Sequence, residues 1–318
     1  MRVVSADDLG RVLTFPKLIA ALREAFRSDI EVPVRHHHPI ARPGEPDAIL
    51  LLMPAWMKGD PAFAGVKVVS IYPGNAARSL PSVMGTYLLM DGATGAPLAA
   101  IDGQALTLWR TAAASALAAS YLVRADARRM AMVGAGALAP YLIAAHASVR
   151  PIAEVRVWNR NPGRAERLAA ELRGRAYSVV ATTDLETAVR EADLVSCATL
   201  SSEPLVKGEW LKPGAHIDLV GGFTPKMREA DDGAVRGAKI FVDTRTGALK
   251  EAGDIVVPLQ TGVIRESDIA GDLFDLCRGK VVGRSSPEEI TLFKSVGTAL
   301  EDLAAAMLVE AELGAAAR

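Results

Sequence analysis

The order of apolar and polar positions divides the chain into a first third of mixed helix and strand and a longer part in which strands and helices alternate. Phe15 to Phe26 has the period of a helix, with Thr14 as its cap and Pro16 in its first turn. Apolar runs then predict strands, the last two joined by an Asp-Gly turn as a hairpin. These strands are expected at 34–40, 48–53, 63–71 and within the hairpin 85–103. Gln104 to Val123 follows as one long helix.

Beyond that helix, short apolar runs alternate with helical segments, the order typical of a doubly wound parallel sheet. Strands are expected at 130–133, 155–158, 177–180, 194–197, 217–220 and 240–242, with helices near 162–172, 184–190 and 227–237. The tail 287–312 is expected to form a long helix with Leu292, Val296 and Leu300 on one face. We therefore predict an α/β protein with a Rossmann-type domain, 124–286, and a discontinuous α+β domain, 1–123 with 287–318.

One strand, turn and helix of this sheet carries a glycine pattern. After the run 130–133 the chain reads Gly134-Ala135-Gly136-Ala137-Leu138-Ala139, followed by an apolar helical segment and the strand 155–158. This is the order that binds a dinucleotide pyrophosphate. Gly134 permits a sharp turn, Gly136 lets backbone N–H groups approach the phosphates, and the helix N-terminus adds partial positive charge. The sequence therefore predicts a nucleotide site here rather than a purely structural turn.

The end of the strand 155–158 indicates which dinucleotide binds. An NAD site usually carries an Asp or Glu there to hold the ribose 2′-hydroxyl. This chain has Trp158-Asn159-Arg160-Asn161 instead, with Arg164 one helical turn further. No carboxylate there repels a 2′-phosphate, and Asn159 with Arg160 can bind one. NADPH is therefore the expected cofactor and NADH the alternative, although two ordinary solvated arginines would leave the same pattern.

Composition narrows the class of protein. Half of the 318 residues are hydrophobic and the formal net charge is −1, so the chain suits two domains and has no basic field for nucleic acid or a membrane surface. Cys197 and Cys277 have neither disulfide nor zinc-ligand spacing. The start, MRVVSADDLG, lacks the plan of a signal peptide, and the apolar segment 104–123 contains Arg110. We expect a cytoplasmic protein.

Three cationic residues stand in apolar surroundings, where an unpaired charge is costly. Lys67 shares a strand face with Val69, so it either faces a ligand or forms a structural ion pair. Arg110 is the single charge of its helix and has leucine and alanine on its own face, so it is expected to point inward towards an anion. Arg35 is either a ligand residue or an exposed strand arginine. Converging beside a nicotinamide, the three cations would hold a carboxylate.

The three histidines after Arg35 invite a metal interpretation. Successive strand residues point to opposite faces, so the three side chains cannot chelate one ion together. His36 and His38 share a face and are candidates for lining the pocket. We therefore expect no metal site in this segment.

Ten stretches spread over the whole chain together resemble the ornithine cyclodeaminase/mu-crystallin family. They are PVRHHHPI, LLLMPAW, GVKVVSIYPGN, GTYLLMDGATGAPLA, LTLWRTAAASALAA, VGAGALA, VWNR, SCAT, GGFTPKMREADD and ITLFKSVGTALED. The resemblance implies a Rossmann domain, a dimerisation domain made from both chain ends, and a homodimer.

The same resemblance implies roles for individual residues. Arg35 and Lys67 match ligands of the substrate carboxylate, and Arg110 joins Lys67 as a candidate catalytic residue near cofactor and substrate. Val296 borders the implied substrate pocket. The implied cofactor contacts are Ser82, Arg110, Ala137, Leu138, Asn159, Thr199 and Ser295.

One loop departs from the cyclodeaminases of this family. Their loop reads GGDxPGK, and its Asp binds the substrate amine and moves protons. This chain reads GGFTPKM, with Phe223 in the place of that Asp and Met227 in the place of the Lys. Phenylalanine cannot bind an ammonium through a carboxylate or exchange a proton. The loop resembles that of the bacterial cyclic ketimine reductases instead, so Phe223 is expected at the substrate site.

The expected reaction is NADPH-dependent reduction of Δ1-pyrroline-2-carboxylate or Δ1-piperideine-2-carboxylate to L-proline or L-pipecolate. Such imines can enter as protonated iminium ions, so the enzyme need not supply a strong acid. Asp218, Lys67, a histidine and bound water are all candidate proton donors, and Asp218 is equally consistent with a structural role. Three alternatives stay open: an ornithine cyclodeaminase, an alanine-dehydrogenase-like enzyme that aminates an open-chain oxo acid, and a non-catalytic ligand-binding protein.

Overall fold

The computed structural model describes residues 1–59 and 62–316, and the chain divides into two compact units. The terminal unit comprises 1–111 and 298–318, and the central unit comprises 112–297. Both chain ends thus belong to one unit. The division differs from the expected boundaries in that 112–123 and 287–297 lie in the central unit. The two units are described separately below.

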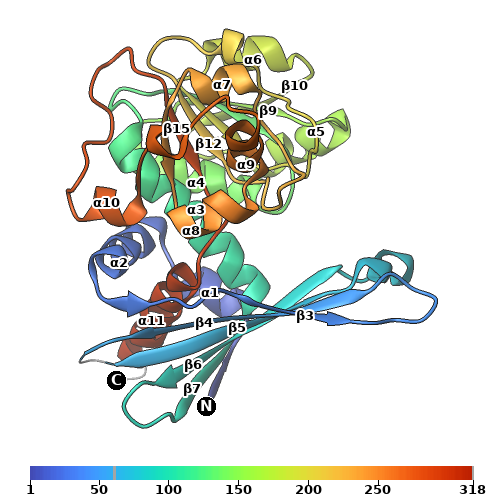
Figure 1. Ribbon diagram of the computed structural model, residues 1–318, viewed down its shortest axis with the longest axis vertical. Coiled ribbons are helices and arrows are strands. Elements are labelled where there is room, and N and C mark those ends of the chain that lie inside the picture. Colours follow the sequence, from blue (N-terminus) through green and yellow to red (C-terminus); the bar gives the residue numbers. More distant parts are fainter. Residues whose placement is uncertain (60–61, 317–318) are drawn as a thin grey trace. The chain divides into compact units, whose positions relative to one another are not determined.

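The terminal unit is built on a sheet of seven strands within the described residues (Figure 1). Its order is β1-β7-β6-β5-β4-β2, with β3 also paired to β4, and every pairing except that of β1 with β7 is antiparallel. The predicted strands and the hairpin are present, and β4 continues through Pro54. The strands are β1 (Arg2–Val4), β2 (Ile30–Glu31), β3 (His36–Ile40), β4 (Ala48–Met57), β5 (Phe63–Ile71), β6 (Val83–Asp91) and β7 (Pro97–Asp102).

Helices cover one face of this sheet. The C-terminal helix α11 (Ala299–Ala316) contacts β4, β5, β6 and β7, and α2 (Phe15–Arg27) packs beside it. Thr14 stands at the cap of α2 as expected, although its side chain makes no capping hydrogen bond. The other helical segments of the unit are α1 (Ala6–Val12), η1 (Pro73–Arg78) and the first part of α3 (Gly103–Leu122).

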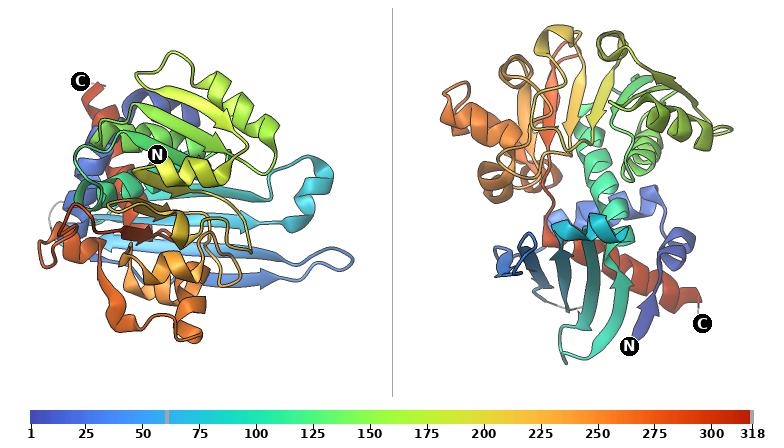
Figure 2. Two further views of the ribbon diagram at one scale, coloured as in Figure 1. Left: turned by 90° about the horizontal axis from the view of Figure 1, so that it is seen from above. Right: turned by 90° about the vertical axis from the view of Figure 1, so that its right-hand side faces the viewer.

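The central unit holds a parallel sheet with the order β10-β9-β8-β11-β12-β15-β13-β14 in the described part of the chain (Figure 2). From β8 the chain proceeds outward through β9 and β10, then returns to place β11 and β12 on the other side. This reversal between β8 and β11 is the switch point at which doubly wound sheets bind ligands. The strands are β8 (Arg129–Val133), β9 (Glu154–Trp158), β10 (Ser178–Thr182), β11 (Leu194–Cys197), β12 (His216–Leu219), β13 (Lys239–Val242), β14 (Ile269–Asp272) and β15 (Thr291–Lys294).

The helices between these strands confirm the predicted α/β architecture. They are α4 (Ala139–Val149), α5 (Pro162–Glu171), α6 (Leu185–Glu191), η2 (Gly208–Trp210), α7 (Asp232–Arg236), α8 (Arg245–Glu251), α9 (Gly253–Gln260), η3 (Glu266–Asp268) and α10 (Leu273–Cys277). No described helix is long and apolar enough to cross a membrane.

The single helix predicted for 287–312 is wrong. Thr291–Lys294 forms β15 between β12 and β13, and the helix begins only at Ala299. A strand buried on both faces shows no alternation of apolar and polar residues, so its pattern is easily taken for part of a helix. Gly297, with a φ of 81°, separates the two elements. The predicted helix at 227–237 is also too long, because only Asp232–Arg236 is helical.

Candidate functional site

The predicted strand–turn–helix–strand unit is present at the switch point. After β8, Gly134 has a φ of 109°, and a side chain there would lie 2.5 Å from the carbonyl oxygen of Ala198 on the neighbouring strand's exit. Both facts require glycine. A side chain at Gly136 would meet no atom within 4 Å, so the backbone there borders open space. Helix α4 then starts at Ala139. The turn is therefore shaped to let a ligand approach its backbone.

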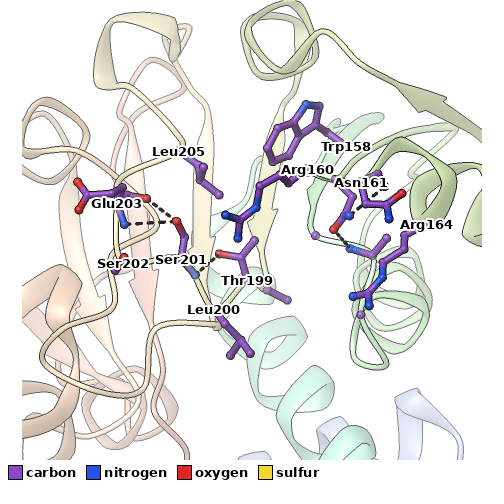
Figure 3. Close-up of a pocket in the computed structure, with 15 residues that line it drawn as sticks. Trp158, Arg160, Asn161, Arg164, Thr199, Leu200, Ser201, Ser202, Glu203 and Leu205 are labelled. Carbon is purple, nitrogen blue, oxygen red and sulfur yellow. Dashed lines mark hydrogen bonds between the residues drawn. The ribbon is translucent and has the colours of Figure 1, made fainter. Parts of the chain in front are cut away.

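A pocket of about 740 Å³ opens beside this turn (Figure 3). One wall is the glycine turn, a second is the end of β9 with the start of α5, and a third is the loop that follows β11. We call it the nucleotide pocket. Its lining residues are Gly134, Ala135, Gly136, Trp158, Asn159, Arg160, Asn161, Arg164, Ala198, Thr199, Leu200, Ser201, Ser202, Glu203 and Leu205.

Asn159 ties the second wall to the glycine turn. Its Oδ1 accepts the backbone N–H of Ala135 at 3.2 Å, and its Nδ2 donates to the carbonyl of Asn161 at 3.0 Å. Arg160 and Arg164 belong to the same wall, and Figure 3 shows the Arg160 guanidinium pointing towards Thr199. The segment 158–164 supplies no carboxylate to the pocket. The choice between NADPH and NADH stays a prediction.

The structure brings only some of the expected cofactor residues together. Gly134, Gly136, Asn159, Arg160 and Thr199 line the nucleotide pocket. The other expected contacts, Ser82, Arg110, Ala137, Leu138 and Ser295, are not among its lining residues. Ala137 and Leu138 complete the turn before α4, Ser295 is buried at the end of β15, and Ser82 and Arg110 belong to the terminal unit. Their roles at a cofactor stay predictions.

The cations Lys67 and Arg110 lie in one buried cluster of the terminal unit. Nζ of Lys67 is 2.9 Å from Oδ1 of Asp302 and 2.8 Å from its Oδ2, and 3.3 Å from Oγ1 of Thr107. Nε of Arg110 lies 3.2 Å from Oδ1 of Asp302, and its Nη1 lies 2.6 Å from Oε2 of Glu301. We call these four charged residues the ion-pair cluster. Arg110 points inward towards an anion as predicted, and Lys67 forms the ion pair that was one of its two alternatives; the anions are carboxylates of α11.

Burial governs the chemistry of Lys67, which is only 3% exposed. It lowers the pKa of Lys67 from 10.5 to about 8, against the raising effect of Asp302. Lys67 is therefore a lysine that loses its charge close to physiological pH. That property suits either an ion pair or a ligand contact, so its role as a substrate ligand stays a prediction.

The sheet register places the start of β3, next to Arg35, one strand beyond the strand that pairs with Lys67. Lys67 pairs with Met53 on β4, and His36 of β3 pairs with Leu52. Arg35 directly precedes β3, whose pairing with β4 begins at His36. Arg35 is half-buried, whereas His36 and His38 are exposed, with ring centroids 6.3 Å apart.

Asp218 proves to be structural. Its carboxylate is fully buried, accepts hydrogen bonds from Ser115 Oγ at 2.9 Å and Ser196 Oγ at 2.7 Å, and lies 3.0 Å from Nε2 of His146. All its partners belong to the core of the central unit, so it is not placed to give a proton to a substrate. Among the described residues, no group of three or more His, Cys, Asp or Glu side chains could hold a metal ion.

The two remaining substrate candidates belong to the central unit. Phe223 lies in the loop after β12 and is 47% exposed, outside the lining of the nucleotide pocket. Val296 follows β15 and packs partly buried against the core of that unit. The role of both residues at a substrate stays a prediction.

Sequence reasoning missed a second buried charge cluster, made of Glu229, Asp254 and Lys294. All three are fully buried in the central unit. Its one signal was a lysine inside the apolar run Thr291–Val296, which the expected helix concealed. The pocket wall after β11, from Leu200 to Leu205, was missed too, because loops carry no periodic signal.

Comparison with known proteins agrees with this architecture. The sequence profile of the ornithine cyclodeaminase/mu-crystallin family matches residues 2–316. The chain is 47% identical over 316 residues to an uncharacterized protein of Schizosaccharomyces pombe, covering 96% of this chain and 95% of that protein. It is 36% identical over 317 residues to the Δ1-pyrroline-2-carboxylate reductase of Colwellia psychrerythraea, covering 98% and 99%. The structure of Thermococcus litoralis Δ1-pyrroline-2-carboxylate reductase in complex with NADH and L-proline is similar with a TM-score of 0.93 and 35% identity, covering 100% and 98%.

Proposed function

Because the chain belongs to the ornithine cyclodeaminase/mu-crystallin family, we propose that it reduces a cyclic ketimine, Δ1-pyrroline-2-carboxylate or Δ1-piperideine-2-carboxylate, with NADPH. The products would be L-proline and L-pipecolate. The protein is an NAD(P)H-dependent oxidoreductase that acts on a CH–NH group. Membership of the family confirms the resemblance found in the sequence.

The choice between imine reduction and cyclodeamination rests on Phe223, which stands where the cyclodeaminases of the family have an aspartate. A cyclodeaminase needs a carboxylate at this position to bind the substrate amine, and a phenyl group has neither the charge nor a proton to exchange. A cyclic imino acid needs only to be oriented by its carboxylate and shielded from water. The half-exposed ring of Phe223 supplies an apolar surface for such a compact substrate.

Arg35 is proposed as part of the substrate site because it matches the carboxylate-binding position that the family resemblance implies. Lys67 and Arg110 are paired with Asp302 and Glu301 in the ion-pair cluster, and those four formal charges cancel. In this proposal the substrate carboxylate lies between Arg35 and Lys67, and Arg110 holds Asp302 in place for Lys67.

The nicotinamide, when bound, supplies the hydride for the imine carbon. The residues of this chain then have to orient the imine and keep water out. Lys67 Nζ is the ionisable group suited to hold or release a proton near neutrality, since its pKa is about 8. The substrate can arrive already protonated, so no stronger acid is required.

The preference for NADPH rests on the wall formed by Asn159, Arg160 and Arg164. A 2′-phosphate bears negative charge, which two guanidinium groups favour and which a carboxylate at the strand end would oppose. Glu203 is the acidic residue among the pocket's lining residues, and it lies on the opposite wall, after β11. NADH is the alternative cofactor.

We extend the proposal to a cytoplasmic homodimer. In Figure 1 the ends of β3, β4, β5 and β6 extend beyond α11. Large apolar side chains are exposed on these strand ends and their connections, including Ile40, Leu80, Val83 and Met84. An exposed apolar surface of this kind usually marks a contact with another protein, and we propose that a second copy of this chain covers it.

One assay tests the reaction. Purified protein is mixed with NADPH and with each cyclic imine in turn, and the absorbance of the reduced cofactor is followed. Oxidation that depends on the imine, without added ammonia, is the expected result. Turnover of an open-chain oxo acid only with free ammonia, ammonia release from ornithine, or NADPH binding without turnover of any imine would each overturn the proposal.

A further inference from the structure

We propose that Glu229 is a positioning residue that couples the wall of the nucleotide pocket to the loop carrying Phe223. The inference rests on the proposed function only in that a nicotinamide cofactor binds in the pocket. Glu229 stands in the run GGFTPKMREADD but lies outside the pocket and is fully buried. It therefore acts through other residues rather than on the cofactor itself.

The carboxylate of Glu229 bridges two loops. Its Oε1 accepts the backbone N–H of Thr199 at 2.7 Å and the hydroxyl of Thr199 at 2.8 Å. Its Oε2 accepts the backbone N–H of Gly221 at 2.7 Å. Thr199 lines the nucleotide pocket after β11, and Gly221 begins the loop after β12. One side chain thus fixes the starting points of both loops.

The contact at Thr199 extends into the pocket wall. The Thr199 hydroxyl accepts the N–H of Ser201 at 3.4 Å, and the Ser201 hydroxyl donates to the carbonyl of Glu203 at 2.7 Å (Figure 3). The backbone carbonyl of Ser201 also accepts the N–H of Arg228, at 2.9 Å. The wall from Thr199 to Glu203 therefore depends on Glu229 at its base and on the Phe223 loop along its length.

The opposite side of the junction is equally confined. A side chain at Gly221 would lie 2.0 Å from the carbonyl oxygen of Thr199 and 2.5 Å from Oε1 of Glu229, so only glycine fits. The loop's return is fixed by Asp254 on α9, whose Oδ1 accepts the N–H groups of Glu229 at 2.8 Å and Ala230 at 3.1 Å. The loop carrying Phe223 is thus held at both ends by buried carboxylates.

The junction buries charged groups, and burying a charge costs free energy. Glu229 and Asp254 share one buried cation, Lys294, whose Nζ lies 3.3 Å from Oδ2 of Asp254. Burial raises the pKa of Glu229 to about 7, against the lowering effect of Lys294, and the nearby charge of Asp254 raises it further. Apolar residues would have filled this space at lower cost. Hydrogen-bond donors from two loops converge on this one buried carboxylate, which points to a positioning role rather than to stability alone.

Three variants test the inference by cofactor binding. Glu229→Gln keeps the size but faces an N–H₂ group towards backbone donors, and Thr199→Val removes the hydroxyl contact. Asp193→Asn is the matched control, because Asp193 is also buried and accepts two backbone N–H groups, those of Arg128 and Arg129, at the opposite ends of the strands. NADPH and NADH dissociation constants are measured by calorimetry, and thermal unfolding is followed without cofactor.

We expect the dissociation constants to rise about tenfold or more in Glu229→Gln, while Asp193→Asn lowers the unfolding temperature but leaves them within about twofold. The dissociation constant of the double variant Glu229→Gln/Thr199→Val should exceed that of the weaker-binding single variant by less than about threefold, because both changes remove the same contact. The inference would be overturned if Glu229→Gln bound the cofactor as well as the unaltered protein, or if the two single changes multiplied in the dissociation constant of the double variant. It would also be overturned if Asp193→Asn weakened cofactor binding as much as Glu229→Gln. If Glu229→Gln does not fold, Glu229→Asp, which keeps the charge but shortens its reach, is compared with Asp193→Asn by the same criterion.

Hydrogen exchange tests the coupling between the loops. NADPH should slow amide exchange severalfold in the peptide that spans 221–230 of the unaltered protein, although this loop lies outside the pocket lining. In Thr199→Val the slowing should be lost at cofactor concentrations that saturate the variant. Equal slowing in both proteins would contradict the coupling. Because no imine is present, failure of the proposed reduction would leave this result interpretable.

Discussion

The ammonium of Lys67 on β5 lies within 2.9 Å of both carboxylate oxygens of Asp302 on α11, although the two residues are 235 positions apart in the chain. Neither side chain is appreciably exposed. Arg110 contacts the same carboxylate, so one residue of the C-terminal helix bridges two cations, and its neighbour Glu301 supplies the second negative charge. This relationship holds α11 against the sheet and fixes the charge that the proposed substrate meets.

Removal of the Asp302 charge should destabilise the protein strongly. Asp302→Asn leaves Lys67 and Arg110 buried with only Glu301 to balance them, a change that typically costs about 3–5 kcal/mol. The matched control on the same helix is Glu312→Gln, whose pair with Lys17 is largely exposed and is worth about 0–1 kcal/mol. Urea unfolding of both variants measures the difference. Equal losses would show that the buried pair contributes no more than a surface one.

Lys67→Met should act on the substrate and spare the cofactor. Asp302 keeps Arg110 as a partner in this variant, but one buried negative charge is left unbalanced, so stability should fall and both ligands are measured well below the unfolding temperature of the variant. The lost charge-assisted contact to the substrate carboxylate is worth about 1.5–3 kcal/mol, so KM for the imine should rise by about tenfold or more. The NADPH dissociation constant should stay within about twofold. Equal effects on both ligands would remove Lys67 from the substrate site.

The pH dependence follows from the lowered pKa of Lys67. Below about pH 8 the side chain is an ammonium that can hold a carboxylate, and above it the side chain becomes neutral. We therefore expect kcat/KM for the imine to fall as the pH rises through about 8. In Lys67→Arg the guanidinium stays charged, so this limb should move to higher pH. Any limb shared by both proteins belongs to the iminium of the substrate. Superimposable profiles would contradict the assignment.

The sequence predicted what depends on local pattern. The glycine turn before α4 and the alternating strands around it are encoded within a few residues, and the nucleotide pocket formed where they indicated. Lys67 and Arg110 could be identified because each is a charged residue among apolar neighbours in the sequence. Their partners on α11 did not, because nothing in a sequence marks which distant carboxylate will meet a buried cation. Lys294 was missed for a related reason: β15 is buried on both faces and lacks the alternation that identifies a strand.

Exchange of Asn159 for aspartate tests the cofactor preference. The new carboxylate can still accept the N–H of Ala135, so the turn should survive, while the donor to the Asn161 carbonyl is lost. Its negative charge would oppose a 2′-phosphate and could accept a hydrogen bond from a ribose 2′-hydroxyl. We therefore expect the ratio of kcat/KM for NADPH to that for NADH to fall about tenfold or more.

The control for this exchange is Gln260→Glu, which adds the same charge to an exposed position at the end of α9 in the central unit. It should leave the ratio within about twofold, because an exposed charge outside the pocket is screened by salt. A ratio unchanged in Asn159→Asp would mean that the arginines of the wall, rather than the absent carboxylate, set the preference. Arg160→Gln and Arg164→Gln would then be the variants that lower it.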